Sequence, residues 1–168
     1  ALNPWFLDID NLIEENFIFI SNPKELGPTN QDKSHLDFDF ADNLTKKLGH
    51  LLLQCWSSQA EERKLAFNKW ISKNSWIEDY ATFVVIKEEF NMLPWWEWPK
   101  EFKIKNKKFL KSWIKAKSDK ILVEKLIQWH LDKQWSAIKK FAKINKVKLI
   151  GDLPFYVSRD SADVWSNK

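Results

Sequence analysis

The sequence predicts an α/β fold, a fragment of a (β/α)8 barrel in which a mostly helical insertion or connection region, residues 1–146, precedes a single strand at residues 147–151. Two observations indicate this. Apolar residues recur with helical spacing through most of the chain. A short apolar run at 147–150 then follows the longest helical pattern directly, a step typical of parallel sheets and barrels. One strand has no ladder partners and a full barrel needs roughly 250 residues, so we expect a chain that is incomplete at both ends.

The N-terminal part is predicted to contain one short helix. Residues 5–7 favour an extended piece, after which Asp8 or Asp10 is expected to cap a helix. From residue 21 to 39 the apolar pattern breaks at Asn-Pro and Gly-Pro steps among polar residues. That composition predicts a surface loop.

Three helices are predicted in the middle of the chain. Leucines recur on one stripe over residues 41–56, which indicates an amphipathic helix. Residues 59–72 continue in the same style, with Ser57 or Ser58 as the expected N-cap. Ser75 is expected to cap the next helix, whose side chains are apolar on nearly every face. Such a helix is expected to be buried on more than one side.

The C-terminal part is predicted to lead from helices into the strand. Two prolines and three tryptophans interrupt the helices at residues 94–99. Residues 107–116 predict a short amphipathic helix, and the longest helical pattern runs from 119 to 145. The strand at 147–151 leads into Asp152. This carboxylate therefore follows the C-terminal end of a strand, where α/β barrels keep their chemistry.

The composition argues against several classes of function. The net charge of +4 rests almost wholly on lysines, and only Arg63 and Arg159 offer the bidentate contacts that nucleic-acid binders use. The densest basic stretch, residues 100–120, is interpreted as a solvated surface, with a polyanion site as the alternative. No run of about 18 apolar residues predicts a membrane span. The single cysteine, Cys55, excludes an internal disulfide and fits a reducing compartment, so we expect a cytoplasmic protein.

No metal or nucleotide site is expected. The three glycines are scattered, whereas a phosphate-binding loop needs them clustered. His35, His50 and His130 have no metal-ligand spacing with one another or with Cys55. Cys55 itself is interpreted as a buried, small apolar residue, because no partnered base lies near it in sequence.

Several segments, in order along the chain, resemble a known family. They are Asn-Pro at 3–4, Trp-Ile-Glu-Asp-Tyr-Ala at 76–81, Pro-Trp-Trp-Glu-Trp-Pro at 94–99, Gln-Trp at 134–135, Gly-Asp-Leu-Pro-Phe-Tyr-Val at 151–157 and Asp-Ser-Ala-Asp-Val-Trp-Ser-Asn at 160–167. Together they resemble the amylomaltases, or disproportionating enzymes, which are 4-alpha-glucanotransferases among the alpha-amylase-like glycoside hydrolases. The resemblance covers nearly the whole chain. Leu2, where the family tends to place glycine, is a departure.

The resemblance implies a (β/α)8 barrel with insertions, in which residues 147–151 form the third strand. It implies transfer of α-1,4-glucan segments between maltodextrins by a retaining mechanism. That chemistry requires no cofactor, and its partner is a maltodextrin, not a nucleic acid or a membrane. The family's Arg-Ile-Asp-His nucleophile motif and its acid/base glutamate do not occur here. No catalytic residue is therefore expected in this chain, and residues 1–168 alone are expected to be inactive.

Four residues are predicted to line the sugar-binding cleft: Asp152, Asp160, Ser161 and Trp165. The resemblance places Asp152 near the reacting glucose; the alternative is a turn cap or a partner for a cation. Asp160 and Ser161 either shape a loop over the cleft or form Asx and Ser turns or a helix N-cap. Trp165 is interpreted more readily as a packing residue than as a sugar platform. The tryptophans at 94–99 fit either packing or glucan contact.

Two other classes of function stay open. A non-catalytic helical carbohydrate-binding or structural module fits the tryptophan-rich composition, and a saturable fluorescence response to maltoheptaose would favour it. A polyanion-binding helical protein would show salt-sensitive affinity for heparin or DNA.

Overall fold

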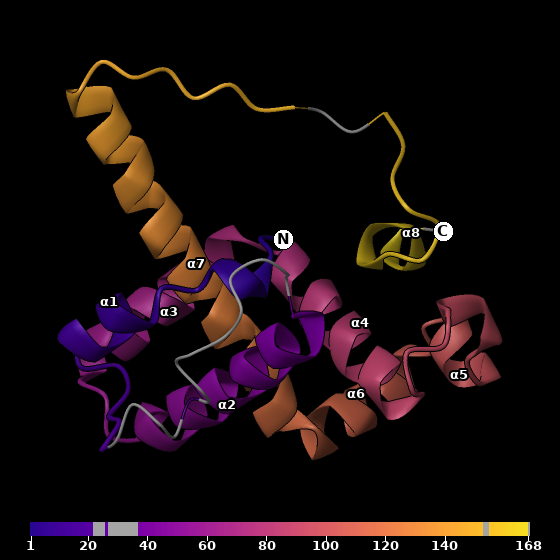
Figure 1. Cartoon of the computed structure of the whole chain (residues 1–168). Helices are drawn as coiled ribbons and strands as arrows, with labels where there is room; N and C mark the ends of the chain where they lie inside the picture. The colour runs from indigo at the N-terminus through magenta and orange to yellow at the C-terminus, as the bar shows by residue number, and fades with distance from the viewer. Residues whose placement is uncertain (22–25, 27–36, 153–154, 168) are drawn as a thin grey trace.

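The long helix α7 (Ser118–Ile144) is the element around which the chain is organised (Figure 1). The structure, a computed structural model, describes residues 1–21, 26, 37–152 and 155–167. Helices α2 (Phe38–Trp56) and α4 (Trp76–Glu89) both pack against α7. Most of the loop predicted at residues 21–39 lies outside the described residues.

The first of two main cores joins the N-terminal elements to α7. It lies between the 3₁₀ helix η1 (Pro4–Phe6) and the helices α1 (Ile9–Glu14), α2, α3 (Glu61–Lys73) and α7. Leu12 and Leu126 are fully buried there. The Trp129 indole of α7 meets the rings of Trp56 and Phe67 at centroid distances of 6.0 and 5.3 Å. Such edge-to-face contacts add specificity to the apolar burial.

Two glutamines of α7 fix the chain that precedes α1. The buried Gln128 carboxamide accepts a hydrogen bond from Leu2 N and donates one to Leu2 O, both at 2.8 Å. Gln134 makes the same pair of bonds with the backbone of Asp8, at 2.9 and 3.0 Å. Each carboxamide therefore bonds to both the backbone donor and the backbone acceptor of one residue in this segment.

The second core lies on the far side of α4. It is formed by α4, the 3₁₀ helix η3 (Trp95–Glu97), and the helices α5 (Lys100–Lys103), α6 (Lys107–Ala116) and α8 (Ala162–Ser166). Its buried residues are Phe83, Ile86, Trp98, Phe102, Leu110 and Trp165. The predicted burial of α4 on more than one side is confirmed, because α4 packs against both α7 and α8.

The helix caps agree only in part with the predictions. Asp8 caps α1 as expected, since its side chain accepts from Asn11 N at 3.1 Å. The predicted serine cap of α3 is wrong: the helix follows Ala60, with no side-chain cap, and Ser58 Oγ donates back to Cys55 O at 2.9 Å. Ser75 precedes α4, but its hydroxyl makes no capping hydrogen bond.

Gly49 sets the distance between α2 and α7. A Cβ added at this position would lie 2.6 Å from Val123 Cγ1. Val123 is β-branched, and its side chain has one strongly preferred rotamer in a helix, so it cannot easily rotate away from an added Cβ. We expect Gly49→Ala to lower the free energy of unfolding by about 1–2 kcal/mol, because the clash outweighs the gain of up to ~1 kcal/mol in helix propensity. Urea unfolding measures the change.

The matched control for this prediction is the Val123→Ala background, which removes the clashing methyl groups. There Gly49→Ala is expected to become neutral or stabilising. The same destabilisation in both backgrounds would show that the two helices are not held apart by this contact.

The α/β prediction is wrong for this chain, because no strand occurs in residues 1–21, 26, 37–152 or 155–167. The predicted strand at 147–151 is instead an irregular segment that leaves the end of α7 and crosses toward α8 (Figure 1). Its side chains are exposed, Val147 at 57% and Ile150 at 96%. A strand is stabilised by hydrogen bonds to a neighbouring strand, and the described part of this chain contains no such neighbour.

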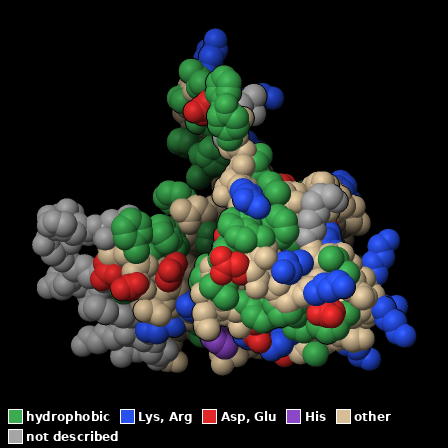
Figure 2. Space-filling model, turned by 90° about the vertical axis from the view of Figure 1, so that its right-hand side faces the viewer, with side chains coloured by type: hydrophobic (Ala, Val, Ile, Leu, Met, Phe, Trp, Pro, Cys, Tyr) green, Lys and Arg blue, Asp and Glu red, His purple; other side chains and the backbone are tan. Residues whose placement is uncertain are grey.

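The last turns of α7 extend away from the helical body. The predicted apolar face is buried at Ile127 and Leu131 but exposed at Ile138, and Phe141, which is not on that face, is exposed too. Hydrophobic side chains gather on the part that rises above the body in Figure 2. No helix in the part of the chain that the structure describes combines the length and apolarity that a membrane crossing requires.

Candidate functional site

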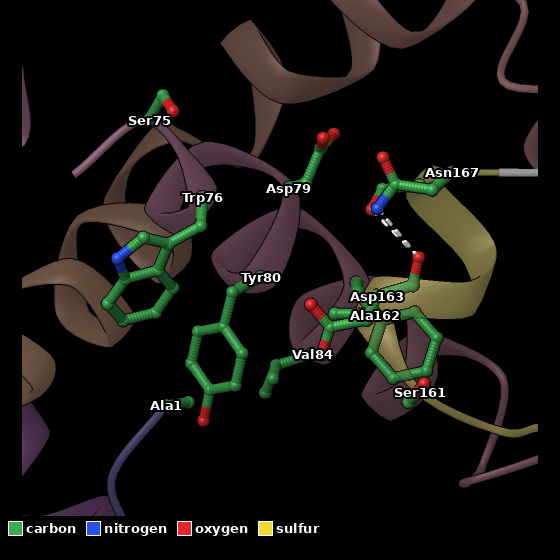
Figure 3. Close-up of a pocket in the computed structure, with 12 residues that line it drawn as sticks. Ala1, Ser75, Trp76, Asp79, Tyr80, Val84, Ser161, Ala162, Asp163 and Asn167 are labelled. Atoms are coloured by element: carbon green, nitrogen blue, oxygen red, sulfur yellow. Dashed lines mark hydrogen bonds between the residues drawn. The ribbon is translucent and has the colours of Figure 1, made fainter. Parts of the chain in front are cut away.

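A cavity of about 710 Å³ lies between α4 and α8. Its lining includes Trp76, Asp79 and Tyr80 of α4, and Ser161, Asp163 and Asn167 from α8 and its flanking residues (Figure 3). The volume falls within the range of small-molecule sites, which mix apolar walls with a few polar groups.

Helical spacing explains the wall that α4 contributes. Trp76, Tyr80 and Val84 are four residues apart, so they lie above one another on one face of the helix. The rings of Trp76 and Tyr80 meet edge to face at a centroid distance of 5.9 Å. Burial, with a smaller contribution from the charge of Glu124, raises the pKa of Tyr80 to about 12. The phenol therefore stays protonated and able to donate near neutral pH.

Trp165 holds α8 against α4. Its indole is fully buried and contacts the rings of Phe83 and Trp98, both at centroid distances of 5.9 Å. Its Nε1 donates to Phe102 O at 3.0 Å, and Lys105 Nζ lies 4.8 Å from the ring centroid. The structure thus places this predicted site residue in the second core, where its ring faces protein groups on several sides.

Asp160 ties the segment before α8 to the body. Its carboxylate forms an ion pair with Lys87 of α4 and accepts from Trp95 N at 3.3 Å. Next to it, Arg159 O accepts from Trp95 Nε1 at 2.7 Å. Both partners of the ion pair are partly buried, with side-chain exposures of 16% for Lys87 and 24% for Asp160, so the removal of either would leave a charge without its partner.

Ser161 begins α8 and lines the cavity. Its hydroxyl accepts from Val164 N at 3.3 Å, which makes it the N-cap of the helix. At the other end of α8, Asn167 Nδ2 donates to Asp163 O at 2.9 Å, as Figure 3 shows. On the opposite wall, Lys105 Nζ pairs with Asp79 Oδ1 at 2.8 Å.

The structure brings Asp160, Ser161 and Trp165 together but leaves Asp152 apart from them. Asp152 lies exposed in the irregular segment between α7 and α8 and is not among the cavity residues. Sequence reasoning missed Trp76 and Tyr80 as site residues. The available signal was the four-residue spacing of two aromatic residues in the 76–81 motif, which places both on one face of a helix.

Trp98, Cys55 and His130 lie in the helical body and are not among the cavity residues. Trp98 is buried and donates from Nε1 to Leu93 O at 2.9 Å. Cys55 is half-buried in α2. Burial, with the charges of Lys133 and Arg63, lowers the pKa of His130 to about 3, so this histidine is neutral near pH 7.

No cluster of three or more His, Cys, Asp or Glu residues that suits a metal ion occurs in the chain as far as the structure describes it. His35 lies outside the described residues.

The same arrangement of helices occurs in a carbohydrate-binding enzyme of known structure. The chain is similar to an amylomaltase from Streptococcus agalactiae solved in complex with acarbose, with a TM-score of 0.87 and 25% sequence identity over 99% of this chain and 34% of that one. The model of the family described as 4-alpha-glucanotransferase matches residues 1–168. The chain therefore belongs to the 4-alpha-glucanotransferase family.

Curated relatives agree with this family. A 4-alpha-glucanotransferase from Clostridium butyricum is 29% identical over 99% of this chain and 34% of its own length. One from Synechocystis sp. is 31% identical over 99% of this chain and 33% of its own length. A chloroplastic/amyloplastic 4-alpha-glucanotransferase from Oryza sativa is 30% identical over 99% and 28%. The chain thus spans about a third of the length of the relatives it matches.

Proposed function

We propose that the whole protein transfers α-1,4-glucan segments from one maltodextrin to another. The observation that carries the proposal is the match of residues 1–168 to the 4-alpha-glucanotransferase family. The likeness to an amylomaltase solved with acarbose supports an oligosaccharide as the ligand.

The reaction is a retaining transfer in two steps. A carboxylate nucleophile displaces the 4-hydroxyl oxygen of the leaving glucan from the anomeric carbon, while a carboxylic acid protonates that oxygen. A hydroxyl group of the acceptor sugar then attacks the anomeric carbon of the glycosyl-enzyme and releases the nucleophile. Its proton passes to the group that acted as the acid in the first step, which is now a carboxylate. Neither carboxyl group is assigned to this chain.

This chain's own contribution is to bind and position sugar. Asp152 is exposed and contacts a substrate hydroxyl in the proposed assembly. Ser161 lines the cavity between α4 and α8. Asp160 and Trp165 act indirectly in this proposal, because the ion pair with Lys87 and the buried indole fix where α8 begins.

We also propose that the protein works in the cytoplasm. A single cysteine, half-buried in α2, suits a reducing compartment. Cell fractionation tests this placement, and recovery of the protein in the extracellular medium would contradict it.

Incubation of the whole purified protein with maltotriose alone tests the proposed activity. A transferase yields glucose together with maltodextrins longer than maltotriose, which chromatography separates. Glucose and maltose without any longer product would indicate a hydrolase. No change in maltotriose, with saturable binding retained, would favour a non-catalytic carbohydrate-binding protein.

A further inference from the structure

We propose that His130 is an acid-sensitive switch: when its imidazole takes up a proton, residues 15–20 separate from the helices α3 and α7. These residues follow α1 in the chain, and α1, α3 and α7 share the first core. Whether the switch operates does not depend on the proposed function, because the switch controls the order of this segment and not the transfer of sugar.

The His130 imidazole lies where a positive charge is costly. The residue is 2% exposed, and its ring meets those of Phe17 and Trp129 at centroid distances of 4.3 and 4.8 Å. Its Nε2 is buried and has no hydrogen-bond partner among the residues that the structure describes. Protonation gives both ring nitrogens a hydrogen and the ring a positive charge. The buried Nε2 would then be a charged donor without a partner.

The charged side chains next to His130 oppose its protonation. Arg63 of α3 lies over the Phe17 ring, with its Cζ 4.2 Å from the centroid, and Lys133 Nζ of α7 lies 4.5 Å from the same centroid. The Glu15 carboxylate already accepts from Lys133 Nζ at 2.8 Å. An imidazolium would therefore add a third positive charge where the nearby carboxylate is already paired.

The other elements of the first core bring apolar or otherwise paired side chains. α2 and the residue after η1 contribute apolar groups: Leu48, Leu52, Trp56 and Leu7. Asp132 of α7 accepts from Trp70 Nε1 of α3 at 2.9 Å. Besides burial, the charges that act on the pKa of His130 are accordingly those of Lys133 and Arg63, and both disfavour the imidazolium.

Side chains from α3 and α7 hold the segment in place. Arg63 donates to Glu15 O at 2.7 Å and to Asn16 O at 3.2 Å. The Phe17 ring is 3% exposed and joins these contacts to His130. Because the segment itself is not helical, it can separate while α3 and α7 stay folded.

Acid shifts the equilibrium toward the released segment. Burial, with the charges of Lys133 and Arg63, lowers the pKa of His130 to about 3 from an ordinary value of 6.5, which the ring regains once the segment has left. The stabilisation is fully present above pH 6.5 and is lost as the pH falls toward 3. Between pH 7.5 and pH 5.5 the released state is expected to gain about tenfold in population.

Two other perturbed carboxyl groups do not obscure this interval. Burial acts to raise the pKa of Glu15, but the hydrogen bond and the charge of Lys133 hold it below 4.5, so Glu15 stays ionised down to pH 5.5. Burial raises the pKa of Glu124 to about 7, but this residue is the same in every protein compared below, so its contribution cancels.

Hydrogen exchange read by mass spectrometry on the whole protein tests the switch. Exchange is measured at pH 7.5 and pH 5.5 and is compared with the intrinsic rate at each pH, which gives a protection factor. In the unmodified protein, the protection of peptides that cover residues 15–20 is expected to fall about tenfold at pH 5.5. In His130→Leu, which removes the titrating ring and its unpaired nitrogen, the same peptides are expected to keep their protection at both pH values.

Two further variants complete the test. His130→Phe keeps a ring in the core and is expected to behave as His130→Leu does. His50→Leu is the matched control, because His50 is exposed on α2, and it is expected to lose protection in residues 15–20 as the unmodified protein does.

Three results would overturn the switch. The first is equal protection of residues 15–20 at both pH values in the unmodified protein. The second is a fall of the same size in His130→Leu and His130→Phe. The third is a fall that is equally large in α6 and the other helices of the second core, because the whole protein and not this segment would then be opening.

Discussion

Trp165→Ala is expected to lower the free energy of unfolding by about 3–5 kcal/mol, the range for deletion of a large aromatic side chain from a core. The indole is fully buried against Phe83 and Trp98, and its removal also leaves Phe102 O without the hydrogen bond from Nε1. Because α8 has only five residues, it has no stability of its own and depends on this contact. The amide protons of α8 are therefore expected to lose their protection from exchange.

Urea unfolding and amide exchange measure the two effects of this substitution. Trp165→Phe, which keeps a ring but loses the hydrogen bond, is expected to fall between alanine and the unmodified protein. Trp135→Ala, on the exposed part of α7, is expected to change the free energy of unfolding by less than about 1 kcal/mol. If Trp165→Ala and Trp135→Ala had equal effects, α8 would not be held by its tryptophan.

Glu124→Gln is expected to stabilise the protein at pH 8 by about 2–3 kcal/mol and to have little effect below pH 4.5. Burial on α7, with a smaller contribution from the charge of Glu88, raises the pKa of Glu124 to about 7 from an ordinary value of 4.5. The folded protein therefore holds this proton more tightly than the unfolded chain does. The stabilisation is fully present below pH 4.5 and is lost as the pH rises to 7, so the neutral glutamine restores it above that range.

Thermal unfolding at several pH values between 4.5 and 8 tests the role of Glu124. The two stability curves are expected to diverge as the pH rises through this range. Glu62→Gln, at an exposed position on α3, is the control and is expected to follow the unmodified protein. Curves for Glu124→Gln that stay parallel to the unmodified protein would show that the carboxyl group is not desolvated.

The helices were predictable where a single pattern determines them. Residues 107–116 became α6, and the expected helix at 119–145 became α7 with a shift of one residue at each end, because each has an apolar face that repeats every three to four residues. The predicted serine cap of α3 is absent because the Ser58 hydroxyl donates to Cys55 O at the end of α2, and α3 begins after Ala60. The apolar run at 147–150 has the composition of a strand, but strand pairing depends on two segments and not on one.

The candidate site could be predicted only in part. The motif at 160–167 pointed to Asp160, Ser161 and Trp165, which the structure places together around α8. It did not show that α4 forms the facing wall, because Tyr80 and Ser161 are far apart in sequence and meet only in the fold. The desolvation of Glu124 likewise depends on the packing of α4 against α7, which no local pattern specifies.

Incorporation of labelled glucose is the most direct test of glucan transfer. The whole protein is supplied with maltoheptaose and ¹³C-labelled glucose, and the products are read by mass spectrometry. Transfer to a sugar hydroxyl predicts maltodextrins that carry one labelled glucose at the reducing end. Maltoheptaose that shortens with no label in any oligosaccharide and no product longer than maltoheptaose would contradict the account, because water and not a sugar would then be the acceptor.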